Sequence, residues 1–257
     1  MPSTAARRVI VSHVRPGPVA LDPGPAHHLR DVLRLKVGDA VEAFDAAGSS
    51  APARIIQADT SAVVLQIDQL RESSTQRRHW TIAAAIPKAQ RADWMIEKLS
   101  ELGTPTFIPL EADRSVVVPQ GIQKHARWDR LATEAARQSY RQGVMKIEPM
   151  MTVHELLSLV RAEHRIAWYC STDPLATPIA QLLAKPLPQP LLVLIGPEGG
   201  WTEREIVLFN QAGLTAVHLT DTVLRVETAA LTAAALIACA LIRGESEPGG
   251  LSHAQPA

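Results

Sequence analysis

The 257-residue chain has little cysteine, no net charge and no long apolar run. Its two cysteines, Cys170 and Cys239, exclude a disulfide scaffold and a cysteine-rich zinc site, and we expect a reducing, cytoplasmic compartment. The longest apolar run, residues 229–242, is too short to span a membrane and is typical of a buried or interface helix. We expect no secretory signal, because the N-terminal residues contain no apolar segment of the required length.

The balance of 26 basic and 26 acidic residues argues against a strongly basic nucleic-acid binder. The distribution is uneven, because residues 151–257 carry 6 Lys and Arg against 10 Asp and Glu. A polyanion would therefore meet the first 150 residues rather than the last hundred. With 46% hydrophobic and 20% charged residues, the composition is that of a globular protein and excludes general disorder.

The length favours two domains. The first part alternates short apolar stretches with proline- and glycine-containing turns, which indicates a small β-barrel or sandwich with one short helix at 27–35. Its predicted strands are residues 9–14, 40–44, 53–57 and 62–67. The polar stretch 71–78 separates this part from the rest, so we place the domains at residues 1–75 and 76–257.

From residue 80 onward, predicted strands and helices alternate, which indicates an α/β domain with a mostly parallel sheet. Thr152 with Glu155, and Thr202 with Glu205, have the spacing of capping boxes that open helices. The run 191–195 is apolar throughout, as in strands buried on both faces. The predicted strands are residues 81–86, 106–110, 144–148, 165–170, 191–195 and 215–219, and the predicted helices include 92–102, 122–141 and one that begins at 227 or 228.

A glycine-rich turn, Gly196-Pro197-Glu198-Gly199-Gly200-Trp201-Thr202, joins the apolar strand to the next helix. In open α/β sheets ligands bind at the carboxyl ends of strands, and glycine lets the backbone approach them closely. The turn has neither the phosphate-binding Gly-Lys-Ser/Thr ending nor the Gly-x-Gly-x-x-Gly spacing. Glu198 and Glu203 would repel an anion, so a cationic or zwitterionic ligand is favoured. The alternative is a plain tight turn.

A second strand-to-helix loop, Leu219 to Ala229, contains Leu224-Arg225-Val226-Glu227-Thr228. Loops from strands close in sequence are expected to lie side by side, which would place Arg225 and Glu227 beside Glu198. The alternative is an N-capped helix with a local Arg–Glu pair.

A charged stripe at helical spacing forms the third feature. It is either a solvated face or a phosphate-contacting face, and Arg114 could join it. The stripe consists of Arg127, Arg130, Glu134, Arg137 and Arg141. His27-His28 is a poor metal site, because adjacent histidines on a helix diverge and no further ligands stand at suitable spacing. No Gly-x-Ser-x-Gly motif supports a hydrolase.

Taken in order, these motifs resemble the RsmE family, the bacterial 16S rRNA uridine-N3 methyltransferases of the SPOUT class. The two strand-end loops match its C-terminal signature, and residues 27–45 match its N-terminal PUA-like barrel. The middle region matches at Pro87-Lys88, Glu97-Lys98, Glu101-Leu102-Gly103, Arg114-Ser115, Arg127-Trp128 and Glu134-Ala135-Ala136-x-Gln138-Ser139-x-Arg141. Tyr140, Met145 and Trp201 depart from the family pattern, although an aromatic ring is retained at 201.

The resemblance implies a PUA-like β-barrel at 1–75, a SPOUT domain with a deep trefoil knot at 76–257, a homodimer, and S-adenosylmethionine as methyl donor. It further implies a set of cofactor-binding residues, which are Leu194, Ile195, Gly196, Pro197, Glu198, Gly200, Leu219, Leu224, Val226, Thr228 and Ala229.

The reaction so implied methylates N3 of one uridine in 16S rRNA on the small ribosomal subunit. A group must remove the N3 proton, for which Glu198 or Glu227 is a candidate, and Arg225 is a candidate to stabilise the charge that develops on the uracil oxygens. Because N3 lies on the Watson–Crick edge, the target must be unpaired or extruded. The predicted RNA contacts are Arg7, Arg8, Arg30, Arg34, Lys36, Lys88, Arg114, Arg137, Gln138 and Arg141.

Two alternatives remain open on the sequence. One is a related SPOUT methyltransferase acting on tRNA, against which the N-terminal barrel motif argues. The other is a non-catalytic RNA-binding assembly factor, against which the intact glycine-rich loop argues. No metal is expected.

Overall fold

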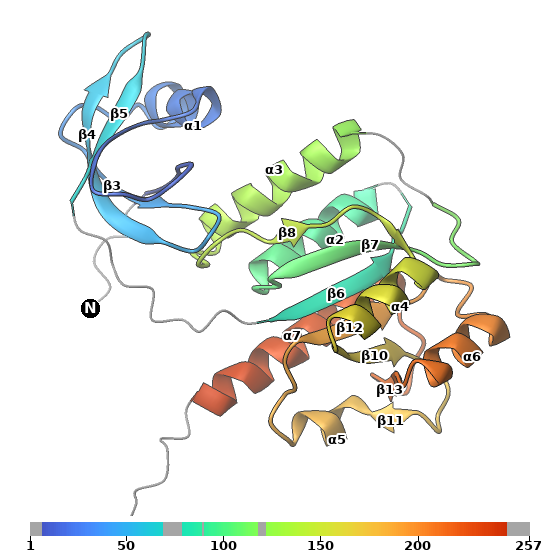
Figure 1. The fold of residues 1–257 in the computed structure, drawn as a ribbon. Coiled ribbons are helices and arrows are strands. Elements are labelled where there is room, and N and C mark those ends of the chain that lie inside the picture. Colours follow the sequence, from blue (N-terminus) through green and yellow to red (C-terminus); the bar gives the residue numbers. More distant parts are fainter. Residues whose placement is uncertain (1–6, 69–78, 89, 118–121, 246–257) are drawn as a thin grey trace, which may run out of the picture. The chain divides into compact units, whose positions relative to one another are not determined.

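A computed structural model describes residues 7–68, 79–88, 90–117 and 122–245 (Figure 1). The chain forms two compact units built from interleaved segments. The first unit lies within residues 1–78, 92–107 and 119–148, and the second within 79–91, 108–118 and 149–257. The domain boundary after residue 75 stays a prediction.

The first unit contains a five-stranded sheet with the order β1-β3-β4-β5-β2. Buried residues alternate with more accessible ones along β4 and β5, so one face of this hairpin packs on a hydrophobic core that includes Leu29, Ile55 and Leu65. The strands are β1 (Arg8–Ile10), β2 (Gly17–Ala20), β3 (Ala40–Phe44), β4 (Ser50–Ala58) and β5 (Val63–Ile67). The small β domain expected of this part is confirmed, and β2 is a strand that the sequence pattern did not predict.

The helix predicted at 27–35 begins earlier and consists of two short pieces. They are α1 (Pro23–His27) and the π-helical turn η1 (His28–Val32). Proline is tolerated in the first turn of a helix, where its missing N–H has no intrahelical partner, so Pro23 and Pro25 start α1 instead of preventing it.

Two long helices complete the first unit, together with β8 (Lys146–Ile147). They are α2 (Gln90–Glu101), whose residues from 92 onward belong here, and α3 (Ile122–Gln138). The Ser100 hydroxyl donates to the Ala132 carbonyl oxygen at 2.8 Å, and the Trp128 indole nitrogen donates to Asp93 at 2.9 Å. These bonds fix α2 against α3.

The second unit is built on a sheet in which the strand order is β11-β13-β10-β12-β6-β7, and β9 also pairs with β7. The pairs β10–β12, β10–β13 and β12–β6 are parallel, and every residue of β12 is buried. The strands are β6 (Trp80–Ala85), β7 (Thr106–Glu111), β9 (Met151–Thr152), β10 (Ile166–Cys170), β11 (Thr177–Pro178), β12 (Leu191–Ile195) and β13 (Thr215–His218). The predicted α/β class with a parallel sheet is confirmed, while the trefoil knot stays a prediction.

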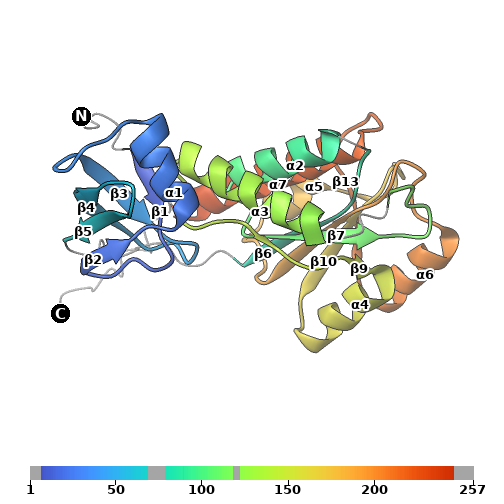
Figure 2. The ribbon, with the colours of Figure 1, turned by 90° about the horizontal axis from the view of Figure 1, so that it is seen from above.

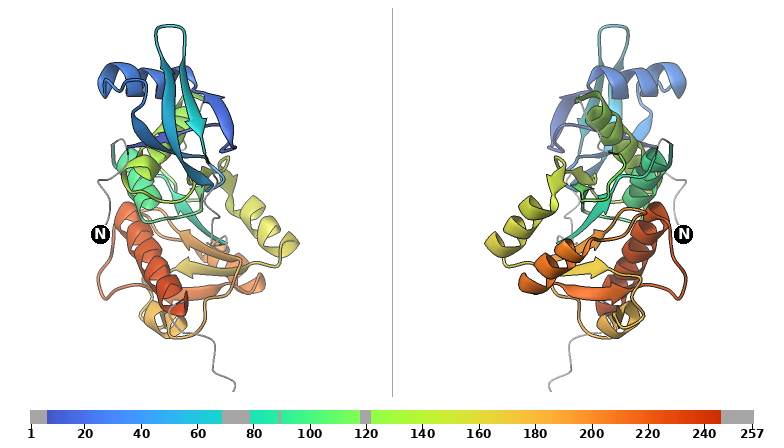
Figure 3. Two further views of the ribbon diagram at one scale, coloured as in Figure 1. Left: turned by 90° about the vertical axis from the view of Figure 1, so that its left-hand side faces the viewer. Right: turned by 90° about the vertical axis from the view of Figure 1, so that its right-hand side faces the viewer.

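Helices cover both faces of this sheet. Figure 2 shows α5 and α7 on one face and α4 and α6 on the other, and Figure 3 shows α7 and α4 on opposite sides of the strands. The helices are α4 (Val153–Ala162), α5 (Ile179–Leu183), α6 (Glu203–Gln211) and α7 (Val226–Glu245). Both predicted capping boxes are present, at Thr152 and Thr202. None of the helices in the described ranges combines the length and the apolar character needed to cross a membrane.

Candidate functional site

The carboxyl ends of β10, β12 and β13 open onto one cavity of about 880 Å³ in the second unit. Because β10 lies between β12 and β13 and is parallel to both, the loops that follow the three strands meet at the same edge of the sheet. The two motif loops therefore contribute to one site, and the loop after β10, residues 171–174, contributes with them. Sequence reasoning missed this third loop, because it carries no motif and only the strand order reveals it.

Most residues predicted to hold a cofactor line this cavity. Leu194 of β12 is instead part of the hydrophobic core, and Thr228 is an exposed residue on α7. The lining residues among those predicted are Ile195, Gly196, Pro197, Glu198, Gly200, Leu219, Leu224, Val226 and Ala229.

The glycine-rich loop is shaped by Trp201. A Cβ atom at Gly196 would lie 2.8 Å from the Trp201 ring, so only glycine fits there without displacing the ring. The indole nitrogen donates to the Cys170 carbonyl oxygen at 2.8 Å, and the ring meets Phe209 edge-on with centroids 4.9 Å apart. Trp201 thus ties the loop after β12 to the end of β10. Burial raises the pKa of the Cys170 thiol to about 12, which leaves it protonated and unreactive at neutral pH.

Arg114 supports the same loop from the other side. Its Nη1 donates to the Gly199 carbonyl oxygen at 2.8 Å and, more weakly, to that of Trp201 at 3.4 Å. The side chain is exposed and also lines the cavity. Arg114 was predicted to contact RNA, and in this structure its guanidinium holds the loop backbone.

A three-residue charge cluster stands at the edge of the cavity. Arg91 Nη1 lies 3.2 Å from Glu227 Oε1, and Arg91 Nη2 lies 3.9 Å from Glu198 Oε1. Glu227 is only 5% exposed, and its second oxygen, Oε2, is buried without a hydrogen-bond partner. Glu198 is far more accessible, with 43% of its side chain exposed, and it lines the cavity. The predicted proximity of Glu198 and Glu227 is thus present, with an arginine between them.

Sequence reasoning missed Arg91, since the motif comparison passed from Lys88 to Glu97. Its position was nonetheless informative, because it closely follows β6, the strand adjacent to β12. Arg225, which was predicted to join the two glutamates, is exposed on the loop before α7. Its carbonyl oxygen accepts from the Ala229 N–H at 2.8 Å, and within the described ranges its guanidinium makes no hydrogen bond or ion pair.

The residues predicted to contact RNA fall into an exposed and an enclosed group. In the first unit Arg7, Arg34 and Lys36 are exposed, and Lys88 is exposed in the second. Arg30 donates to Asp31 and to the Asp59 carbonyl oxygen, while Arg137 and Gln138 donate to Glu134. These side chains lie at the surface with local acidic partners.

Arg8 and Arg141 belong to the enclosed group. Arg8 is 3% exposed, its Nη1 donates to the carbonyl oxygens of Ala136 and Arg141, and its guanidinium lies 4.1 Å from the Phe44 ring centroid. Arg141 donates to the carbonyl oxygens of Ser100 and Thr104, and burial lowers its pKa to about 10. Both guanidiniums are occupied inside the first unit, so the structure corrects the expectation that they face RNA.

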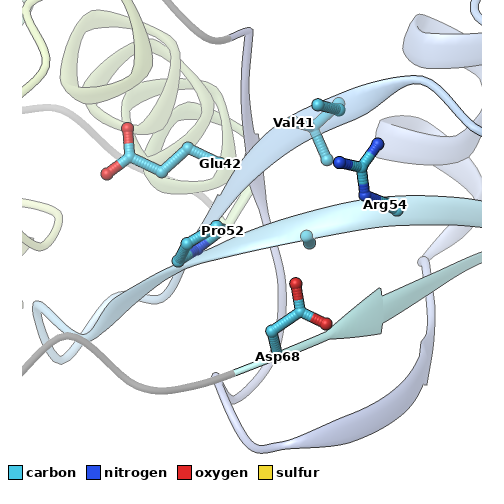
Figure 4. Close-up of a pocket in the computed structure, with 7 residues that line it drawn as sticks. Val41, Glu42, Pro52, Arg54 and Asp68 are labelled. Atoms are coloured by element: carbon cyan, nitrogen blue, oxygen red, sulfur yellow. The ribbon is translucent and has the colours of Figure 1, made fainter.

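A smaller cavity of about 190 Å³ lies beside β3 and β4 in the first unit. Figure 4 shows Glu42 turned away from Arg54 and Asp68. Glu42 already pairs with Arg8 at 3.3 Å, and Arg54 donates to the Gly38 carbonyl oxygen. The charged groups therefore do not converge on a ligand position.

Known families match both parts of the chain. The sequence profile of a family described as an RNA methyltransferase domain matches residues 74–238, and one described as an RNA methyltransferase PUA domain matches residues 21–68. Fold, cavity and profiles together define an RNA methyltransferase that carries a PUA domain.

Two individual relatives identify the family more precisely. A Bacillus subtilis protein named "Ribosomal RNA small subunit methyltransferase E" is 32% identical over 230 residues, which cover 85% of this chain and 90% of the relative. A Synechocystis sp. protein of the same name is 32% identical over 85% of this chain and 72% of its own length. The chain belongs to the ribosomal RNA small subunit methyltransferase E family.

A solved structure agrees with this assignment. The ribosomal RNA small subunit methyltransferase E of Neisseria gonorrhoeae, crystallised with S-adenosyl methionine, is 26% identical to this chain. It superimposes with a TM-score of 0.81 over 90% of this chain and 96% of its own. The family resemblance stated from the motifs is confirmed.

Proposed function

We propose that this protein transfers a methyl group from S-adenosylmethionine to N3 of one uridine in the 16S rRNA of the small ribosomal subunit. The observation that carries the proposal is the meeting of both motif loops at one cavity, with Glu198 on its wall. The names of the relatives and the cofactor in the Neisseria structure support the same activity.

The residues of the cavity fit this cofactor. At Gly200 an added Cβ would meet no atom within 4 Å, so the bare backbone there leaves room for a ligand, and the carboxylate of Glu198 suits a positively charged sulfonium. Phosphate-containing cofactors would instead meet this carboxylate unfavourably. The residues we propose to hold the cofactor are Ile195, Gly196, Pro197, Glu198, Gly200, Leu219, Leu224, Val226 and Ala229.

When bound, the cofactor supplies an electrophilic methyl group. The protein must then hold uracil N3 in position and accept its proton. We assign the base role to Glu198, because it lines the cavity and is accessible, whereas Glu227 is buried against Arg91. Arg225 is exposed beside this site and is the candidate to stabilise charge on O2 or O4 of the uracil.

RNA binding is assigned to the exposed basic groups. Arg7, Arg34 and Lys36 belong to the first unit, and Arg30, Arg137 and the neutral Gln138 add to them when phosphate displaces their acidic partners. Lys88 and Arg114 belong to the cavity-bearing unit. A homodimer, the cytoplasm as compartment and the domain division at residue 75 complete the proposal.

The test is methyl transfer from labelled S-adenosylmethionine to small ribosomal subunits that lack this modification, followed by mass spectrometry of the nucleosides. We expect 3-methyluridine at one position of 16S rRNA. Incorporation into tRNA alone would favour a related methyltransferase, and cofactor binding without transfer to either RNA would favour an assembly factor.

The same assay tests the base. Glu198→Gln should lower turnover by about a hundredfold or more, because loss of a general base typically has effects of this size. Glu203→Gln is the matched control, since Glu203 is an exposed glutamate in the first turn of α6 and does not line the cavity. Full turnover by Glu198→Gln would exclude the assigned role.

A further inference from the structure

Arg91 is placed between the two glutamates of the site. One of its amino groups is in hydrogen-bond contact with buried Glu227, at 3.2 Å, and the other is 3.9 Å from accessible Glu198. The arginine itself is 36% exposed. The cluster thus contains two carboxylates and one guanidinium. The position of Arg91 therefore determines how far each of the two carboxylates is neutralised.

Glu227 depends on this contact. A carboxylate that is 5% exposed and has one oxygen without a partner is costly to keep ionised unless a cation lies against it. Its neighbours Val226 and Ala229 line the cavity, and all three residues belong to the first turn of α7. An anchor on Glu227 therefore also fixes one wall of the cavity.

The two distances imply unequal neutralisation. The closer carboxylate, Glu227, takes most of the attraction, since Coulomb energy falls with separation and the buried partner is less screened by water. Glu198 retains its negative charge toward the cavity. This leaves one net negative charge where a cationic group of a ligand would lie.

We propose that Arg91 is a positioning residue of the methyltransferase site. It pins Glu227 and the first turn of α7, and by engaging Glu227 it leaves Glu198 free to face the cationic centre of the cofactor. This inference rests on the proposed function, because it takes S-adenosylmethionine as the ligand.

The proposal predicts coupling between Arg91 and Glu227 that does not require a ligand. We would compare Arg91→Met, Glu227→Gln and the double variant by chemical denaturation of the intact chain. Each single variant should be less stable than the wild type, and the double variant should be no less stable than Arg91→Met. Arg91→Lys should retain part of the stability, and Arg204→Met, at an exposed arginine of α6, is the control.

The second prediction concerns cofactor charge. S-adenosylmethionine carries a sulfonium cation, and S-adenosylhomocysteine lacks it, so calorimetric titration with both isolates the electrostatic contribution. Glu227→Gln should lower the preference for the cationic ligand roughly fivefold, because Arg91 is then free to neutralise Glu198. Adding Arg91→Met to Glu227→Gln should restore the preference.

A purely structural role would change the affinities for both ligands alike. The same ratio of the two affinities in every variant, or additive losses of stability in the double variant, would overturn the proposal. If the wild-type protein binds neither ligand, the proposed function fails, and the stability comparison still decides whether Arg91 and Glu227 act as a pair.

Discussion

At the scale of single residues, the contact between Gly196 and Trp201 restricts position 196 to glycine. An added Cβ at 196 would meet the indole ring at 2.8 Å, and that ring is held by Cys170 and Phe209. The ring therefore cannot move without losing a hydrogen bond and an aromatic contact. This constraint gives the first glycine of the motif a packing reason that is independent of any ligand.

Gly196→Ala should therefore destabilise the protein by about 1–3 kcal/mol through overpacking and should weaken binding of S-adenosylmethionine. Thermal or chemical denaturation and calorimetric titration measure the two effects. Gly24→Ala is the matched control, because a Cβ there meets no atom within 4 Å. Unchanged stability and affinity in Gly196→Ala would contradict the packing argument.

At the residue scale, some parts of the site could be predicted from the sequence and others could not. The glycine-rich loop at 196–202 and the loop at 219–229 were predictable because each joins a strand to a helix. Arg91 and the loop at 171–174 were not, since their contribution arises from the order β13-β10-β12-β6 in the sheet. Burial of Arg8 was equally hidden, because an arginine near the N-terminus gives no periodic signal of being enclosed.

At the scale of elements, the sequence pattern predicted strands and helix starts in both units. β12 and β3 have the predicted bounds, and Thr152 and Thr202 cap α4 and α6 as expected. The missed elements are short: β2 (four residues), β9 and β11 (two residues each) and α5 (five residues). Such segments contain too few residues to show a period, and their form depends on the neighbours with which they pair.

The π-helical turn η1 has a pH dependence that follows from its own charges. The hydrogen bond from Arg30 lowers the pKa of Asp31 to about 2, and His27 adds to the effect. An unfolded aspartate titrates near about 3.9. Because the folded-state pKa is the lower one, the stabilisation is complete above about pH 4 and is lost as the pH falls through about 2.

Denaturant midpoints of the wild type and of Asp31→Asn should therefore differ at pH 7, converge below about pH 4 and have lost most of their difference at about pH 2. Arg30→Met should lose most of the same pH dependence, because it removes the principal donor. A difference between wild type and Asp31→Asn that stays constant down to pH 2 would show that this pair does not contribute.

At the scale of the whole molecule, the charge distribution separates two classes of arginine and lysine in the first unit. Enclosed Arg8 joins β1 to the end of α3 through two carbonyl oxygens and pairs with Glu42. Burial lowers its pKa, because the guanidinium has exchanged water for protein contacts. Lys36 is exposed and its ammonium group is available to phosphate.

These classes should respond oppositely to substitution. Lys36→Met should leave stability unchanged, weaken RNA binding and reduce the slope of log K against log salt by about 1, as expected when one phosphate contact is lost. Arg8→Met should cost about 2–4 kcal/mol of stability, because it leaves buried carbonyl groups and Glu42 without their partner.

Lys185→Met, at an exposed lysine of the acidic second unit, is the control for the loss of one positive charge. Salt titrations of binding to a 16S rRNA fragment, read beside denaturation curves, measure both quantities. A reduced salt slope in folded Arg8→Met would show that Arg8 leaves the core to contact RNA, and the division into structural and RNA-facing cations would then fail.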